Sequence, residues 1–216
     1  MTLDFEKLRR EMVEQQIKSR GIKDDRVLNA FREVPREEFV EEKYKSSAYN
    51  DGALPIGAGQ TISQPYIVAL MIDSLNLKSD EKVLEIGTGS GYAAAVLSRM
   101  VEEVYTIETI ESLAQKAIRR FDRLEYNNIE VKIGDGTLGW AENAPYDGIV
   151  VSAAAPHVPD ALIKQLSENG RIVIPVGEKG GVQRLKVIRK GEEGKTRAEK
   201  LDYVRFVPLR GENGYH

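Results

Sequence analysis

Apolar residues recur at helical spacing in the first part of the chain and predict two helices. The first covers residues 4–20, where apolar pairs lie four positions apart, and it ends at Gly21. The second begins after Asp24 or Asp25, either of which can cap it, and it is closed by Pro35. Its apolar stripe consists of Val27, Leu28, Phe31 and Val34. We expect these helices to form a lid or appendage.

Residues that favour turns fill the segment from Tyr44 to Pro65, although it lacks the charge of a disordered linker. They are Asn50, Asp51, Gly52, Pro55, Gly57, Gly59 and Pro65. We therefore predict an ordered loop without a regular element. A largely buried, apolar helix is predicted from Pro65 to Leu75, because proline is favourable in the first turn of a helix.

Five short apolar runs follow and predict strands. They are Val83–Ile86, Val104–Ile107, Ile129–Ile133, Gly148–Val151 and Arg171–Pro175. Amphipathic stretches at 92–100 and 110–124 separate the first three runs, which is typical of βαβ units. The handedness of such crossovers then favours a doubly wound, mostly parallel α/β sheet. Alternating residues around a polar loop at 191–194 predict a C-terminal antiparallel hairpin that closes the sheet.

The composition excludes several classes of function. The 31 basic and 34 acidic residues leave a net charge of -3, which gives no indication of a nucleic-acid partner. The absence of cysteine and the presence of only two histidines argue against a metal centre. The amino terminus is charged, and no segment approaches the ~18 apolar residues of a membrane span. We expect a soluble cytoplasmic protein with one principal domain and no contact with membranes.

The segment from Val83 to Tyr92 predicts a strand that leads through alternate glycines into a helix. Ligands bind at this place in open α/β sheets, although the glycines could also serve only a tight turn. A dinucleotide motif would require its third glycine at Tyr92, whereas the glycines here are Gly87, Gly89 and Gly91. Glu85 suits a cationic amino-acid group and would repel a pyrophosphate. The arrangement resembles motif I of class I S-adenosylmethionine methyltransferases, whose fold is Rossmann-like.

Two further acidic residues lie where such a ligand needs them. Glu108 ends the second apolar run, where its carboxylate can accept hydrogen bonds from both ribose hydroxyls or, alternatively, cap the following helix. Asp135 follows the third run, at the position that receives the adenine amino group in such enzymes. A plain turn aspartate between Gly134 and Gly136 is the alternative for Asp135.

The chain as a whole resembles the protein-L-isoaspartate O-methyltransferase family. The resemblance rests on residues 54–65 (Leu-Pro-Ile-Gly-Ala-Gly-Gln-Thr-Ile-Ser-Gln-Pro), on the glycine motif, on residues 134–136 and on the ending at 206–212. It implies a seven-stranded class I methyltransferase sheet, S-adenosylmethionine as methyl donor, and a monomer that acts on isoaspartyl-containing proteins and peptides. Residues 1–78 would carry the N-terminal helices and the substrate loop, packed on a methyltransferase core of residues 79–216 as one compact unit.

The resemblance also implies site residues. Ser63 matches the active-site serine of the family, next to the reactive carboxylate. The implied cofactor-binding residues are Glu85, Gly87, Gly89, Gly91, Glu108, Asp135 and Gly136. The implied substrate-binding residues are Pro55, Ile56, Gly57, Thr61, Ser63, Val207 and Leu209.

A carboxylate acceptor is already ionised at neutral pH, so its methylation requires positioning and no general base. Ser63 would orient the acceptor, and capping of the helix after Pro65 is its alternative role. A hydrolase is excluded because neither Ser63 nor Ser90 has glycine two residues away on both sides. We interpret His157 as a loop residue.

Two rival hypotheses are a related methyltransferase that acts on RNA or a small molecule, and a non-catalytic binding module. Methylation of a base amino group predicts a motif of proline and aromatic residues after the fourth strand, but residues 150–156 contain no aromatic side chain. A binding module should have lost the glycines or the acidic residues of the cofactor motif, and all are present.

Overall fold

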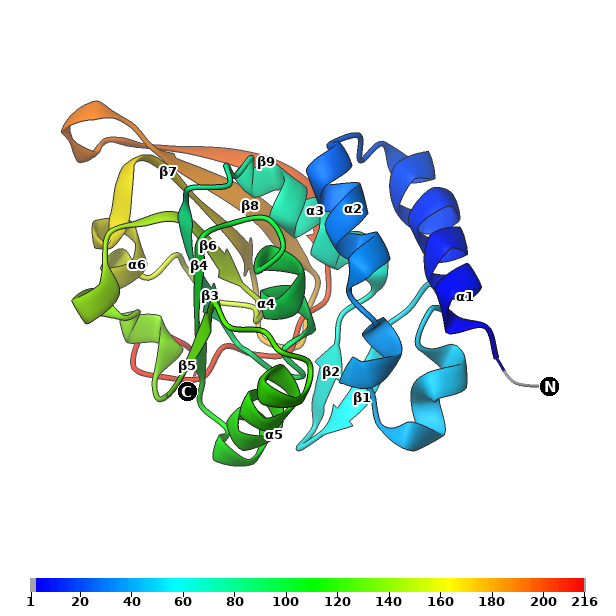
Figure 1. Ribbon diagram of the computed structural model, residues 1–216. Helices are drawn as coiled ribbons and strands as arrows, with labels where there is room; N and C mark the ends of the chain where they lie inside the picture. Colours follow the sequence, from blue (N-terminus) through cyan, green and yellow to red (C-terminus); the bar gives the residue numbers. More distant parts are fainter. Residues whose placement is uncertain (1–2, 216) are drawn as a thin grey trace.

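The computed structural model describes residues 3–215, and within them the main sheet has seven strands (Figure 1). They are β3 (Lys82–Ile86), β4 (Glu103–Glu108), β5 (Ile129–Ile133), β6 (Tyr146–Val151), β7 (Leu166–Val176), β8 (Gln183–Lys190) and β9 (Thr196–Val204). Their spatial order is β5-β4-β3-β6-β7-β8-β9. Neighbours from β5 to β7 are parallel, whereas β8 and β9 are antiparallel additions. The predicted doubly wound, mostly parallel fold is confirmed.

Helices cover both faces of the sheet, because side chains along a buried parallel strand point alternately to opposite sides (Figure 1). Val83 of β3 packs into a core shared with the described helices α1 (Phe5–Met12), α2 (Asp25–Glu33), α3 (Pro65–Leu75), α4 (Tyr92–Leu97) and α5 (Glu111–Arg123). The next residue, Leu84, packs into a second core with Leu162 of α6 (Asp160–Lys164). The predicted helices at 65–75, 92–100 and 110–124 are therefore present, with small differences at their ends.

The N-terminal helices differ in two ways from the prediction. The first one is not uniform, since α1 continues through a π-helical turn at Val13–Ile17 and a 3-10 turn at Lys18–Arg20. Gly21, with φ 101°, ends it as predicted, and the Asp24 side chain caps α2. The interpretation of these helices as a lid or appendage is wrong, because their apolar stripes are buried in the same core as the sheet.

The segment at 44–65 is ordered, but it contains regular structure that the sequence did not predict. Strands β1 (Leu54–Gly57) and β2 (Gln60–Ile62) form an antiparallel hairpin. Its turn residues Ala58 and Gly59 both have positive φ, 51° and 70°, as in the tight turns that join short hairpins. The hairpin was missed because its strands are short, Pro55 interrupts the pattern, and Ala-Gly is a weak turn signal.

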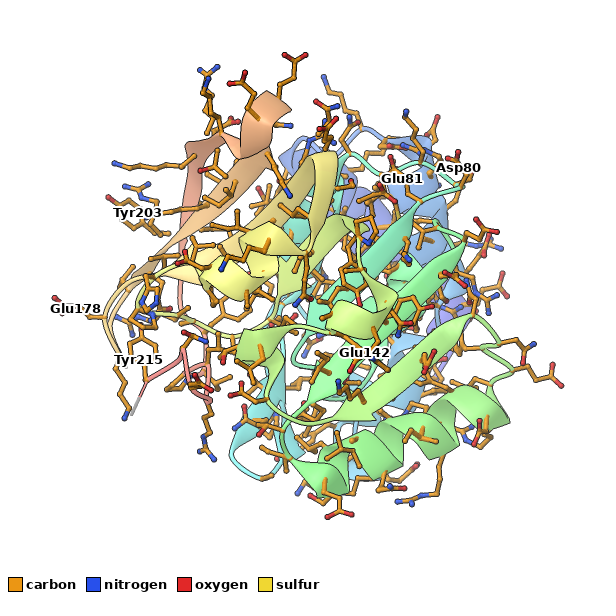
Figure 2. The ribbon with its side chains drawn as sticks, turned by 90° about the vertical axis from the view of Figure 1, so that its left-hand side faces the viewer. Asp80, Glu81, Glu142, Glu178, Tyr203 and Tyr215 are labelled. Atoms are coloured by element: carbon orange, nitrogen blue, oxygen red, sulfur yellow. The ribbon has the colours of Figure 1, made fainter. Side chains whose placement is uncertain are left out.

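The C-terminal hairpin has the predicted antiparallel pairing, and β9 forms one edge of the sheet. Tyr203 lies at this outer edge (Figure 2). The Arg184 guanidinium stacks on its ring. Asp80 and Glu81 precede β3 and mark the amino ends of the parallel strands (Figure 2). After β9, the chain returns to the opposite, carboxyl ends. There Ala154 donates to the Val207 carbonyl at 2.8 Å and accepts from Leu209 N at 2.7 Å.

Gly91 illustrates how backbone conformation fixes the start of α4. It has φ 88°, a conformation that costs an L side chain roughly 1–2 kcal/mol. A Cβ at this position would lie 2.5 Å from Cζ of Phe121, which packs in the core from α5. The third glycine of the motif therefore allows α4 and α5 to approach each other, and its place in the cofactor motif has a packing explanation.

We predict that Gly91→Ala lowers the free energy of unfolding by about 2–4 kcal/mol, from backbone strain and overpacking together. Urea unfolding measures the change. Gly134→Ala is the matched control, because Gly134 lies in the same layer of loops, its φ is not positive, and nothing lies within 4 Å of an added Cβ. Equal stability of the two variants would contradict this account of Gly91.

Candidate functional site

A cavity of about 850 Å³, open to solvent, lies at the carboxyl ends of β3, β4 and β6. Strand β3 has β4 on one side and β6 on the other, so chain connections leave it in opposite directions at this point. Ligands of open α/β sheets bind in such crevices. The predicted site residues on its wall are Thr61, Ser63, Glu85, Gly87, Gly89, Glu108, Gly136, Val207 and Leu209.

The loop between β3 and α4 brings backbone to the cavity. Gly87 and Gly89 both have positive φ, 96° and 54°, and both line the cavity. A Cβ on Gly89 would lie 3.3 Å from the Ile56 side chain of β1. Glycine therefore leaves this part of the wall free for a ligand, and it lets the N-terminal hairpin approach the loop.

Glu85 is fully buried at the end of β3, and one of its oxygens has no partner. Its Oε2 accepts from Thr106 Oγ1 at 2.7 Å, and Thr106 Oγ1 is 2.7 Å from Thr88 Oγ1. Burial raises the pKa of Glu85 to about 8; the Thr106 hydrogen bond opposes this shift, and the nearby Glu108 charge adds to it. A buried carboxylate with an unused oxygen on the cavity wall fits a ligand that brings positive charge and N–H donors.

Glu108 holds the glycine loop and the start of α5 together. Its Oε2 accepts from Gly89 N at 2.8 Å, and its Oε1 accepts from Ile110 N at 2.9 Å. The helix-cap alternative thus describes one of these bonds, because Ile110 is the N-cap of α5. A carboxylate oxygen has two lone pairs, so each retains one for a ligand hydroxyl, and the two roles are compatible.

Asp135 and Gly136 have different environments. The Asp135 carboxylate accepts from Thr137 N and Thr137 Oγ1 at 2.8 and 2.7 Å, and from Glu212 N at 2.7 Å. These contacts are those of the turn-aspartate alternative, and the side chain is not on the cavity wall. Gly136 does line the cavity, where a Cβ would lie 2.5 Å from Ile86 Cγ2. The role of Asp135 toward adenine stays a prediction.

A second cavity of about 800 Å³ adjoins the first, and four residues line both. They are Thr61, Ser63, Ser152 and Val207. Pro55, Ile56 and Gly57 belong to β1 and line neither of these two cavities. Helix α3 begins after Gln64 without a side-chain cap, so capping by Ser63 is not observed. Ser63 instead lies where the two cavities meet.

Several residues of the site were not predicted from the sequence. Ser152 follows β6 directly, and the rule that ligands bind at carboxyl ends of strands would have indicated it. Thr106 of β4 donates to Glu85, and Thr88 of the loop contacts Thr106, which no local pattern reveals. His157 is exposed and lines neither cavity. Residues 3–215 contain no cluster of side chains suited to a metal ion, and no helix among them is long and apolar enough for a bilayer.

Comparison with known sequences extends over nearly the whole chain. The model of the family "Protein-L-isoaspartate(D-aspartate) O-methyltransferase" matches residues 7–214. Protein-L-isoaspartate O-methyltransferase 2 of Pelobacter propionicus is 56% identical over 215 residues, which cover 99% of this chain and 96% of that protein. The protein-L-isoaspartate O-methyltransferase of Pelotomaculum thermopropionicum is 56% identical over 208 residues, 96% of this chain and 90% of that protein.

Solved structures agree with these sequence relatives. A protein-L-isoaspartate O-methyltransferase superposes with a TM-score of 0.87 at 33% identity, covering 95% of this chain and 67% of the other. A Plasmodium falciparum protein, described as a protein-L-isoaspartate O-methyltransferase in complex with S-adenosyl-L-homocysteine, gives 0.79 at 27% identity and covers 94% and 98%. Because family model, relatives and structures coincide over almost every residue, the chain belongs to the protein-L-isoaspartate O-methyltransferase family.

Proposed function

We propose that this protein transfers a methyl group from S-adenosylmethionine to the free carboxylate of L-isoaspartyl residues in damaged proteins and peptides. The observation that carries the proposal is the junction of the two cavities at Ser63, with the cofactor motif on one side. Membership of the family supports the choice of reaction and acceptor. A cytoplasmic location and a monomeric state stay predictions from the sequence.

The first cavity fits the proposed methyl donor. Glu85 has an unpartnered oxygen for the ammonium group, and Glu108 has free lone pairs for ribose hydroxyls. Gly87, Gly89 and Gly136 would place their backbone against the ligand, since side chains at these positions would fill the wall or strain the loop. When bound, S-adenosylmethionine supplies an electrophilic methyl group on a positively charged sulfur.

The residues of this chain act by positioning the acceptor. A carboxyl group with an ordinary pKa near 4 is ionised at neutral pH and is nucleophilic without a base. Ser63 would donate its hydroxyl hydrogen to one carboxylate oxygen and leave the other free to attack. Orientation of this kind can supply roughly 7–11 kcal/mol of the barrier. The exposed position of His157, away from both cavities, supports a mechanism without a histidine base.

The second cavity would hold the polypeptide on either side of the acceptor. Its wall combines the loop at 51–53 with residues 203–207, which are distant in the sequence. In an isoaspartyl residue the main chain runs through the side-chain methylene and leaves the α-carboxylate free. A wall that fixes both the carboxylate and the adjoining peptide should therefore distinguish isoaspartyl from aspartyl linkages.

We predict that one peptide in its isoaspartyl and normal aspartyl forms is methylated with kcat/KM values that differ by roughly a hundredfold or more, in favour of isoaspartyl. Transfer of a labelled methyl group from S-adenosylmethionine measures both rates. Equal rates would overturn the assigned acceptor and leave the methyltransferase class intact. Failure to methylate either form would overturn the proposed function.

We predict that Glu108→Ala weakens binding of S-adenosylhomocysteine by about 1.5–3 kcal/mol for each charge-assisted bond lost. Calorimetry measures the affinity, and Glu111→Ala is the control, because that exposed carboxylate lies on the same turn outside the cavity. An analogue without the ribose hydroxyls should lose affinity for the wild type but little for the variant. Lower stability with unchanged affinity would show that Glu108 serves only to anchor the loop and helix.

We predict that cofactor binding at pH 6–7 releases up to about one proton from Glu85. Its folded-state pKa of about 8 keeps the carboxyl protonated in this range, and a bound ammonium group favours the ionised form. Affinity should therefore rise with pH by up to about tenfold per unit until the pH passes 8. Calorimetry in buffers of different ionisation enthalpy measures the proton, and Glu85→Gln should abolish it. Proton uptake by the wild type would contradict the assignment.

A further inference from the structure

Arg36 is a fully buried cation without an acidic partner among residues 3–215. The adjoining Glu37 carboxylate is instead engaged with Tyr49 and lies 3.6 Å from Arg9. Nη1 of Arg36 is buried and makes no well-formed hydrogen bond, and the group that interacts with the guanidinium is the neutral Tyr92 hydroxyl. Isolated buried charges are costly, so a guanidinium in this position needs an explanation beyond packing.

The two hydrogen bonds of good geometry that Arg36 makes are to main-chain carbonyls at the two ends of residues 48–63. Nη2 donates to the Ser63 carbonyl at 2.7 Å, and Nε donates to the Ala48 carbonyl at 2.7 Å. Ser63 itself lines both cavities, where they meet. A single residue thus separates the buried positive charge from the place where the proposed function puts the acceptor carboxylate.

The same guanidinium also contacts the cofactor side. Its central carbon lies 4.7 Å from the ring centroid of Tyr92, which lines the first cavity at the start of α4. Phe39, at the end of the 3-10 turn that Arg36 begins, packs on the same ring with centroids 5.6 Å apart. From the other side, Arg120 donates to the carbonyls of both Glu38 and Ser90 at 2.6 Å. The turn at 36–39 therefore connects the segment that carries Ser63 with the glycine-containing loop between β3 and α4.

We propose that Arg36 is a positioning residue for the acceptor: it fixes the Ser63 loop and supplies the unpaired buried charge that favours entry of a carboxylate. This inference rests on the proposed function and adds to it a source of charge selectivity. The bond to the Ser63 carbonyl sets where the hydroxyl can reach. The positive charge, held in a region of low dielectric, attracts an anion and offers nothing to a neutral amide. A lysine at this position would retain the positive charge but would lack the planar guanidinium, whose Nε and Nη2 bind two carbonyls at once.

The experiment compares an isoaspartyl peptide with its carboxamide analogue, the latter used as a competitive inhibitor, on wild type, Arg36→Lys and Arg36→Met. Wild type should bind the carboxylate at least about tenfold more tightly than the carboxamide. Arg36→Met should raise the KM for the isoaspartyl peptide by about 10- to 100-fold and remove this preference. Arg36→Lys should keep part of the preference. Affinity for S-adenosylhomocysteine should change by less than about threefold, since Arg36 does not line the cofactor cavity.

A double-mutant cycle tests whether Arg36 acts through Ser63. Ser63→Ala alone should lower kcat/KM by about 10- to 100-fold. Added to Arg36→Lys, it should cost less than the product of the two single losses, because both changes disturb one contact. Arg171→Met is the matched control: Arg171 also donates to main-chain carbonyls, but those of Leu75 and Asn76, which line neither cavity, whereas Ser63 lines both. It should change thermal stability and leave KM unaltered.

Each outcome of these experiments either supports or overturns the role of Arg36. Arg36 variants with lower melting temperature, unchanged KM and an intact preference for carboxylate would show a structural role and overturn the inference. If Arg36→Met does not fold, the lysine variant and the preference of the wild type for carboxylate still test the inference. A wild type that binds carboxylate and carboxamide equally overturns it. A wild type that methylates no isoaspartyl peptide overturns the proposed function itself, whereas an active wild type with indifferent Arg36 variants overturns only the role of Arg36.

Discussion

Two carboxylates, Glu85 and Glu108, lie at the carboxyl ends of adjacent parallel strands, and no ion pair within residues 3–215 includes either one. Burial of Glu85, with a smaller contribution from the Glu108 charge, raises its pKa and keeps a proton on it near neutral pH. On the acceptor side, Arg36 is buried with no acidic partner in the same part of the chain. Acidic groups thus border one of the two adjoining cavities, and a buried basic group lies close to the other. In the proposed function, a cationic donor meets the carboxylates and an anionic acceptor meets the arginine.

The sheet makes this separation of charge possible. Parallel pairing brings the ends of β3, β4 and β6 to one edge, while α4 and α5 start from that edge with their unpaired N–H groups. The acceptor side is built from residues distant in sequence: the β1–β2 hairpin, the turn at 36–39 and the segment around Val207. In the proposed function, the cofactor motif therefore belongs to the sheet, and the acceptor specificity belongs to the segments that precede and follow it.

Local periodicity predicted most of the fold, because the stripes of α1, α2, α3 and α5 and the apolar runs of the central strands are strong signals. The β1–β2 hairpin escaped prediction because its short strands carry no alternating pattern. In the site, Glu85 and Glu108 could be placed by their spacing from the strand ends. The contacts of Arg36 with Ala48 and Ser63 join residues 12 and 27 positions apart, and such contacts have no sequence signature. For Asp135 the sequence position between two glycines was clear, but it gave no information about the direction of the carboxylate, which accepts from Thr137 and Glu212.

The exposed edge strand β9 has a consequence for a protein that handles damaged polypeptides. Unfolded or partly unfolded chains offer free N–H and C=O groups that can add as an extra strand to any open sheet edge. On β9, Arg197, Glu199, Lys200 and Asp202 fill the outer rim with charge of both signs, and nearly every residue of the strand is exposed. Charged side chains along an edge strand disfavour pairing with another chain, so a client is less able to extend the sheet at β9, while the junction of the two cavities stays open to it.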